Sequence, residues 1–250
     1  MTSDLPGTGA SGAAPSGAAP SSAVPSGAAV SGARLVLATH NAHKLGELRA
    51  ILAPAVPGLD PAAVVGARDV GAPEPVEDGV TFAENALIKA RALAAFTGLP
   101  AVADDSGLAV DVLGGAPGIF SARWAGQHGD DAANLRLLLA QLADIAPRHR
   151  GAQFVCAAAL VTPDGAEHVE LGYLRGTLAT EPRGAGGFGY DPVLVPDGQE
   201  PAAARSCAEL TAQEKNAISH RGQALRALAP VIAAVLGRSS DDGPDDAARR

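Results

Sequence analysis

Two adjacent carboxylates, Asp104 and Asp105, follow a short apolar run and precede Ser106 and Gly107. The apolar run, residues 101–103, is typical of a buried strand. Ligand sites in open α/β sheets lie outside the carboxyl ends of strands. A strand that delivers Asp-Asp-Ser-Gly there predicts the floor of a metal or phosphate site. Asp, Ser and Gly also favour turns, so an ordinary turn is the alternative for these four residues taken alone.

A second polar group, Thr-His-Asn-Ala-His-Lys at positions 39–44, connects an apolar strand at 34–38 to a helical pattern. Backbone N–H groups at a helix N-terminus attract anions, so this connection predicts a phosphate cradle. The alternative is an ordinary helix that Asn41 caps, with Lys44 in solvent.

A helix predicted from residue 82 to about residue 96 carries a further cation, Lys89, four residues after Asn85 and on the same face. Thr81 and Glu84 have the form of a capping box at its start. Glu84 is therefore predicted to cap the helix rather than to take part in catalysis.

Three potential cations, Lys215, His220 and Arg221, precede an amphipathic helix that extends to Leu236. As a charge run alone they predict a solvated surface. Another cation, Arg123, ends an irregular loop rich in Gly and Pro.

Residues 184–189 match the pattern GxGxxG. The dinucleotide-binding fingerprint also needs a strand before the glycines and a helix after them. Here Pro192 breaks any helix, and residues 193–195 resemble a strand. The context favours a flexible loop that presents Phe188 and Tyr190 to a flat ligand.

Strands and helices alternate between these groups, which predicts an α/β fold. A weak strand is expected at 62–66, a helix up to Leu142 that Asp130 or Asp131 caps, and a hairpin of strands at 152–161 and about 169–178.

The 250 residues carry a formal net charge of −8 and are 47% hydrophobic but only 3% aromatic. The core is therefore expected to be aliphatic, and the acidic balance argues against a protein that binds a nucleic-acid backbone. Cys156 and Cys207 form no CxxC pair, so neither a zinc site nor a disulfide framework is indicated.

Both ends of the chain differ from the middle. Residues 1–33 are almost wholly Ala, Gly, Ser, Pro and Thr and are predicted to be disordered. Residues 237–250 are predicted to form a loose acidic tail, which leaves a folded domain at 34–236. A signal peptide and a membrane span are not expected.

Six blocks of sequence now stand in a fixed order and resemble the inosine/xanthosine triphosphate pyrophosphatase family, over nearly all of residues 34–236. The blocks are THNAHK at 39–44, FAENALIKA at 82–90, ADDSGL at 103–108, GGAPG at 114–118, GFGYD at 187–191 and KNAISHRG at 215–222. The family commonly has Gly where this chain has His40.

The resemblance implies an elongated mixed α/β sheet with flanking helices and two lobes around a nucleotide cleft. It also implies Mg²⁺, a cytoplasmic homodimer, and hydrolysis of purine nucleoside triphosphates such as ITP, dITP and XTP to monophosphate and pyrophosphate. Neither nucleic acid nor a membrane is an expected partner.

The resemblance also implies roles at matching positions. Asp105 is expected to accept a proton and, with Glu77, to hold the metal. Phosphate is expected at Thr39, His40, Asn41, Ala42, His43 and Lys44. Other substrate contacts are expected from Lys89, Ser106, Arg123 and Lys215. The base is expected between Phe188, Gly189, Tyr190, Asp191, His220 and Arg221.

Specificity follows as a hypothesis from hydrogen-bond chemistry. Arg221 has only donors, and a protonated His220 donates from both nitrogens. Such a pair suits the 6-carbonyl of hypoxanthine or xanthine and mispairs with the 6-amino group of adenine. Guanine shares the carbonyl, so its exclusion is expected at position 2.

Two other functions compete with this interpretation. A nicotinamide-dependent oxidoreductase would use residues 184–189, against which the missing helix argues. A non-catalytic nucleotide-binding protein would have little use for the carboxylates Glu77, Asp104 and Asp105 beside phosphate.

Overall fold

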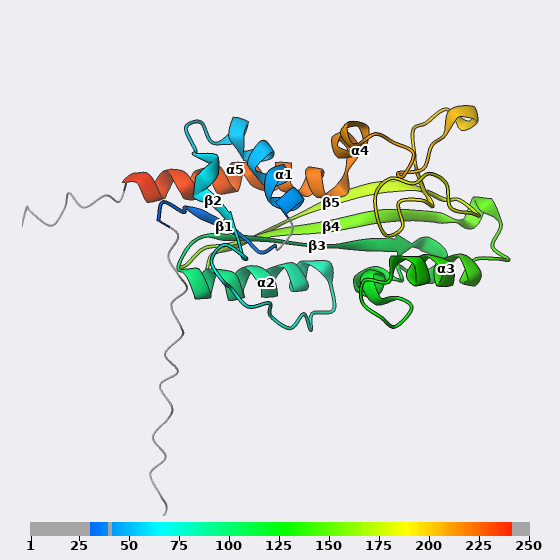
Figure 1. Ribbon diagram of the computed structural model, residues 1–250, viewed down its shortest axis with the longest axis horizontal. Coiled ribbons are helices and arrows are strands. Elements are labelled where there is room, and N and C mark those ends of the chain that lie inside the picture. Colours follow the sequence, from blue (N-terminus) through cyan, green and yellow to red (C-terminus); the bar gives the residue numbers. More distant parts are fainter. Residues whose placement is uncertain (1–30, 40–41, 242–250) are drawn as a thin grey trace, which may run out of the picture.

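The computed structural model describes residues 31–39 and 42–241, with the backbone alone at 42–43 and 238–241 (Figure 1). Both predicted tails, 1–33 and 237–250, fall largely outside the described residues. The final helix continues to Asp241, whereas the apolar pattern predicted an end at Leu236.

A six-stranded mixed sheet in the order β2-β1-β3-β4-β5-β6 forms the centre of the fold. β1 pairs in parallel with β2 and β3, and the other neighbours are antiparallel. Three long strands, β3 to β5, give the molecule its elongated shape (Figure 1). The strands are β1 (Leu35–Leu37), β2 (Val64–Gly66), β3 (Ala101–Val110), β4 (Gly151–Val161), β5 (Glu167–Leu178) and β6 (Leu194–Pro196).

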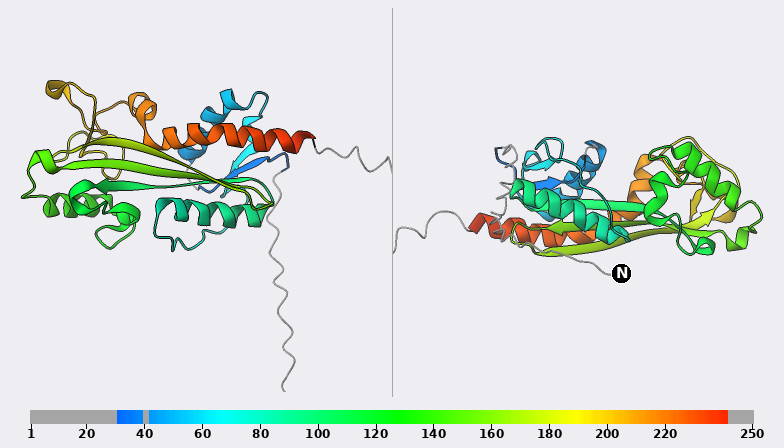
Figure 2. Two further views of the ribbon diagram at one scale, coloured as in Figure 1. Left: turned by 180° about the vertical axis from the view of Figure 1, so that it is seen from behind. Right: turned by 90° about the horizontal axis from the view of Figure 1, so that it is seen from below.

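Helices cover both faces of this sheet. α1 and α5 lie on one face, and α2 lies on the other (Figure 1). α3 packs at the far end of the long strands with Leu108, Val110 and Phe154, whose side chains alternate in phase with that of Asp104. Figure 2 shows that the elements gather at the two ends of the long strands, as the two expected lobes. The α-helices are α1 (Ala42–Ala55), α2 (Phe82–Thr97), α3 (Asp131–Gln141), α4 (Ala212–Ile218) and α5 (His220–Asp241).

Helix α2 begins and ends where its sequence predicts. The Thr81 hydroxyl accepts a hydrogen bond from the Glu84 N–H at 3.1 Å, which satisfies a backbone donor of the first turn. Gly98 ends the helix in the left-handed region, at φ 67°, where a side chain would be strained. These caps fix where Lys89 lies along the sheet.

Strand β3 is longer than its apolar run predicted. The sequence placed Asp104 and Asp105 beyond the end of a strand, but β3 continues through both to Val110. The long antiparallel ladder with β4 causes this difference, because it pairs every β3 residue from Ala101 to Val110. The turn alternative is therefore excluded, and the two carboxylates point to opposite faces of the sheet.

The other edge of β3 is open beside the carboxylates. β1 pairs with β3 only at Ala101 and Val102. Further along, within the described residues, this edge makes one isolated bridge, between Ala109 and Pro117. Side chains from both faces of the sheet can therefore reach the space between the two lobes.

Residues 184–189 lead into β6 without an intervening helix. This arrangement agrees with the sequence context and removes the nicotinamide-dependent alternative. No helix in the described part of the chain combines the length and the apolar character that a membrane span requires.

Candidate active site

Asp104 lies on the face of β3 that α1 and α5 cover. Its carboxylate accepts hydrogen bonds from Lys44 Nζ and from Arg221 Nε, each at 3.1 Å from Oδ2. Lys44 comes from the first turns of α1, and Arg221 comes from the start of α5. One buried carboxylate thus joins two helices that are far apart in the sequence.

Asp104 is ionised because two cations contact its carboxylate. Burial alone would raise the pKa of its carboxyl, but the positive charges of Arg221 and Lys44 outweigh burial and hold the pKa well below its usual range. Asp104 is therefore ionised and occupied by two cations. Such a carboxylate positions cations and is poorly suited to accept a proton.

Asp105 lies on the opposite face, against α2. Its oxygens accept hydrogen bonds from Asn85 Nδ2 at 3.3 Å and from Lys89 Nζ at 3.4 Å. Lys89 Nζ also lies 3.3 Å from Glu77 Oε1. The lysine therefore brings two carboxylates from different segments to one point.

The loop that carries Glu77 is held by the same helix. Asn85 Oδ1 accepts a hydrogen bond from the Gly79 N–H at 2.9 Å. A side chain at position 79 would have its Cβ only 2.7 Å from that oxygen. Close contact between Gly79 and Asn85 thus fixes Glu77 beside Asp105.

The pKa of the Asp105 carboxyl shifts in the direction opposite to that of Asp104. Burial raises the pKa, the charge of Lys89 opposes this shift, and the charge of Glu77 adds to it. A carboxylate with a raised pKa is a stronger base, which suits proton transfer.

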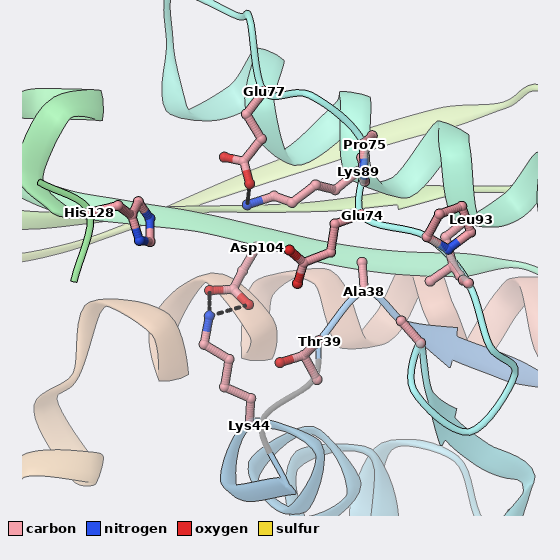
Figure 3. Close-up of a pocket in the computed structure, with 13 residues that line it drawn as sticks. Ala38, Thr39, Lys44, Glu74, Pro75, Glu77, Lys89, Leu93, Asp104 and His128 are labelled. Carbon is pink, nitrogen blue, oxygen red and sulfur yellow. Dashed lines mark hydrogen bonds and ion pairs between the residues drawn. The ribbon is translucent and has the colours of Figure 1, made fainter. Parts of the chain in front are cut away.

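A cavity of about 270 Å³ opens beside these groups, and we call it the lysine cavity. Lys44 and Lys89 enter it from α1 and α2, and Asp104 lies between them on β3 (Figure 3). Its other polar lining residues are Thr39, Glu74, Glu77 and His128.

A second cavity, of about 130 Å³, lies toward the other lobe, and we call it the aromatic cavity. Its Phe188 side chain is 67% exposed, and Lys215 Nζ lies 5.0 Å from the centre of the Phe188 ring. Other lining residues include Ser106, Asp131, Phe154, Tyr190, Asp191 and His220.

The loop that carries Phe188 is held by its neighbours. Asp191 accepts a hydrogen bond from the Phe188 N–H at 2.8 Å and forms an ion pair with Lys215. The Gly189 N–H donates to Asp131 Oδ2 at 2.9 Å. These contacts are specific, so this loop is not the loosely held segment that its glycines predicted.

Tyr190 differs from its expected role as an aromatic side chain presented to a ligand. It is 5% exposed, and its hydroxyl donates to the Ser121 carbonyl at 2.9 Å. Tyr190 therefore forms a wall of the aromatic cavity and fixes the loop, whereas Phe188 is the aromatic side chain open to a ligand.

The specificity hypothesis takes His220 as protonated, whereas its surroundings favour the neutral ring. Burial lowers the pKa of His220 to about 3, and the charges of Arg221 and Lys215 add to the effect. The neutral ring stacks on Phe154 with 5.1 Å between centroids. Its buried Nδ1 has no hydrogen-bond partner within the described chain.

Arg221 and Arg123 do not lie at the aromatic cavity. Arg221 faces Asp104, with a long contact of 3.5 Å to the Ser106 hydroxyl. Arg123 lies 5.3 Å from the ring of Phe120 and lines neither cavity. The hypothesis that Arg221 and His220 together read purine position 6 is therefore not supported by their placement.

The start of α5 lies very close to β5 at Gly172. A Cβ atom at this position would lie 2.0 Å from the His220 carbonyl oxygen and 2.7 Å from the Ala224 nitrogen. Glycine is thus required for the approach that places His220 and Arg221 over the sheet.

The first predicted block, 39–44, is described in part. Thr39 and Lys44 line the lysine cavity. His40 and Asn41 lie outside the described residues, and Ala42 and His43 begin α1.

Sequence reasoning missed several residues of the site. The spacing of Asn85 from Lys89 predicts a shared helix face but no role in the site. The pattern around Asp131 predicts only a helix cap. His128 and Phe154 carried no motif, so only the fold brings them to the cavities.

The fold is a mixed α/β sheet whose open edge borders two cavities. One cavity holds lysines and carboxylates, and the other holds aromatic rings. The protein is therefore an α/β protein whose site suits a phosphate-bearing ligand with a flat ring. The chain belongs to the Ham1 family, whose model matches residues 35–231. This finding confirms the resemblance noted in the sequence.

Two relatives illustrate the similarity in sequence. A dITP/XTP pyrophosphatase of Streptomyces coelicolor is 67% identical over 205 residues, which cover 82% of this chain and 99% of that protein. A dITP/XTP pyrophosphatase of Corynebacterium efficiens is 58% identical over 212 residues, which cover 82% of this chain and 100% of that protein.

Solved structures agree with the fold. A HAM1 protein from Coxiella burnetii aligns with a TM-score of 0.72 at 42% identity, covering 81% of this chain and 99% of that chain. A nucleoside-triphosphatase / dITP/XTP pyrophosphatase from Mycobacterium abscessus aligns with a TM-score of 0.66 at 52% identity, covering 79% and 99%.

Proposed function

We propose that this protein hydrolyses non-canonical purine nucleoside triphosphates, among them dITP and XTP, to the monophosphate and pyrophosphate. The observation that carries the proposal is Asp105, a carboxyl with a raised pKa beside Glu77 and Lys89, at the open edge of β3. The neighbouring residues Asp104 and Ser106 line the lysine cavity and the aromatic cavity. A nucleotide that spans both cavities would present its α-phosphate near Asp105.

The donor set suits Mg²⁺, which prefers one or two carboxylates together with waters and phosphate oxygens. Glu77 and Asp105 converge on one point, now bridged by Lys89 Nζ. Within the described residues no group of three or more His, Cys, Asp or Glu side chains forms a complete cage. When bound, Mg²⁺ would neutralise phosphate charge and lower the pKa of water.

The chain's own residues account for the rest of the chemistry. Asp105 accepts a proton from the water whose oxygen attacks the α-phosphorus. The bond from this phosphorus to the bridging oxygen breaks, and its electron pair leaves with pyrophosphate. Lys44 and Lys89 stabilise the phosphate charge that develops in the lysine cavity.

Base recognition is assigned to the aromatic cavity. The exposed ring of Phe188 can stack on a purine, a contact worth about 1–3 kcal/mol per base in nucleic-acid proteins. Lys215 has donors only and lies over the same ring. It therefore replaces Arg221 as the group that favours a 6-carbonyl over a 6-amino group.

We also propose a homodimer, as the family resemblance implies. Leu171 and Tyr173 are 46% and 43% exposed on β5, and they share the sheet face that α2 covers only in part (Figure 1). Burial of these side chains against a second copy would contribute apolar area to an interface. Light scattering is expected to give the dimer mass, and a monomer mass at micromolar protein would reject this assignment.

The test of function is pyrophosphate release with Mg²⁺ from ITP, dITP, XTP, ATP and GTP. The proposal expects release from the first three and far slower release from ATP and GTP. Binding of ITP without any pyrophosphate release would favour the non-catalytic alternative.

A further inference from the structure

His128 is the lining residue of the lysine cavity that comes from the second lobe. The other lining residues all belong to the segment from Ala38 to Asp104. His128 lies between the 3-10 helix Gly118–Arg123 and α3. Figure 3 shows its imidazole at the end of the cavity nearest Glu77 and Asp104, opposite Leu93. A ligand in this cavity would therefore be approached from both lobes.

The segment that carries His128 is held in place. The Gly129 N–H donates to the Ala122 carbonyl at 2.8 Å. The Ala125 N–H donates to the buried side chain of Asn134 at 2.7 Å. Ala122 itself lines the aromatic cavity, whereas His128 lines the lysine cavity, so this held segment contributes to both cavities.

The lysines of the cavity already have anionic partners. Lys44 binds Asp104, and Lys89 lies between Glu77 and Asp105. In contrast, the His128 imidazole makes no hydrogen bond or ion pair with any other described residue. It is exposed in the cleft, so its ring N–H can donate to a ligand without breaking an existing contact.

We propose that His128 is a further substrate-contacting residue of the reaction, which rests on the proposed pyrophosphatase function. Its ring N–H donates a hydrogen bond to the phosphate chain on the side of the leaving pyrophosphate. As the bond between the α-phosphorus and the bridging oxygen breaks, negative charge grows on that pyrophosphate. A donor aimed at this charge stabilises the transition state, and the imidazole keeps its proton throughout.

The test compares His128→Ala and His128→Gln with wild type in the full chain, and Gln127→Ala serves as the control. Gln127 is the neighbouring residue of the same segment and lines neither cavity. Because one placed donor is removed, kcat/KM for ITP is expected to fall about 10- to 100-fold in His128→Ala. His128→Gln, which retains an N–H donor, should recover much of this loss, and Gln127→Ala should match wild type.

Inhibition by the two products distinguishes two explanations for a loss of activity in His128→Ala. One is the loss of a contact to phosphate, and the other is a displacement of the segment that carries residue 128. In His128→Ala the inhibition constant for pyrophosphate should rise about tenfold, the effect of one hydrogen bond to a charged group. Inhibition by IMP should stay at the wild-type value.

Two results for His128→Ala would overturn the inference while the wild type is active. One is a kcat/KM equal to that of wild type, and the other is equal weakening of inhibition by pyrophosphate and by IMP. A wild-type protein that releases no pyrophosphate would overturn the proposed function as well, so the two failures are distinguishable.

Discussion

Asp104 and Asp105 are neighbours in the sequence, yet they occupy two different regions of the molecule. On the α1 and α5 face, Asp104 is buried between two cations, and its pKa is lowered. On the α2 face, Asp105 shares one lysine with Glu77, and its pKa is raised. The alternation of a strand thus gives two identical side chains opposite electrostatic surroundings.

This difference assigns separate tasks to the two carboxylates. A permanently ionised and occupied Asp104 holds Lys44 and Arg221 in place. Asp105, whose charge is only partly compensated, is left to bind metal and accept a proton. Predictions for four variants follow from this division, from the largest expected effect to the smallest.

Asp105→Asn should give the largest loss of activity. The amide retains the shape but neither binds metal well nor accepts a proton, so turnover should fall at least ~100-fold. Pyrophosphate release from ITP measures this effect. Near-normal turnover would assign proton transfer to Asp104 or Glu77 and would contradict the division of tasks between Asp104 and Asp105.

The same variant should be more stable than wild type at neutral pH. A carboxyl whose pKa is raised in the folded state destabilises the fold at pH values above that pKa. The amide removes this cost, so the Tm of Asp105→Asn should lie above that of wild type at pH 7. The gap should close as the pH falls and Asp105 becomes protonated.

Asp104→Asn should have the opposite effect on stability. Removing one partner of a buried ion pair leaves Lys44 and Arg221 uncompensated, at a cost of about 3 kcal/mol. Thermal unfolding at pH 7 should therefore show a lower Tm, with a smaller loss of turnover than in Asp105→Asn.

The pH dependence sharpens this prediction. Because the folded pKa of Asp104 is lowered, its contribution is complete above the unfolded pKa of about 3.9. It is lost as the pH falls from there toward the folded pKa. The Tm difference between wild type and Asp104→Asn should therefore shrink in acid, and a constant difference would contradict the ion-pair explanation.

Lys215→Met should change selectivity, and it should also lower the Tm, because it leaves the buried carboxylate of Asp191 without its ion-pair partner. The side chain keeps similar bulk but loses the donors assigned to the 6-carbonyl, so the preference for ITP over ATP should fall about tenfold or more. Arg221→Ala is the matched comparison, because it should lower activity on ITP and ATP alike. The reverse pattern would restore Arg221 as the base-reading residue.

Deletion of residues 1–30 should have the smallest effect. Apart from Ala, their only apolar side chains are Met1, Leu5, Val24, Val30 and the prolines, too few to offset the entropy of ordering the segment on a domain. Tm and turnover should stay at the values of the full chain, because the deletion does not change the surroundings of Asp104 or Asp105. A Tm several degrees lower would indicate that this segment packs on the domain.

Local signals in the sequence predicted much of the fold. Thr81 marked the start of α2, and two neighbouring strand patterns predicted the β4–β5 hairpin. The lack of a helix after Gly189 was also predicted, because Pro192 acts on neighbouring residues. Each of these signals depends on a few adjacent positions.

The site could not be predicted to the same degree, because its chemistry depends on distant contacts. Asp-Asp-Ser-Gly is typical of a turn, and only pairing with β4 extends β3 through it. The ion pair between Asp104 and Arg221 joins residues 117 positions apart. The neutral state of His220 follows from burial, which no local pattern reveals.

The absent side chain of Gly172 limits how this sequence can change over evolution. Two residues that face the cleft from α5 keep their places because β5 offers bare backbone beneath the helix. Even one added methyl group would have to lift the helix start, moving Arg221 from Asp104 and His220 from Phe154 together. A substitution at position 172 would therefore alter both cavities at once. A Gly172→Ala variant with unchanged activity would show that the start of α5 can shift without affecting the site.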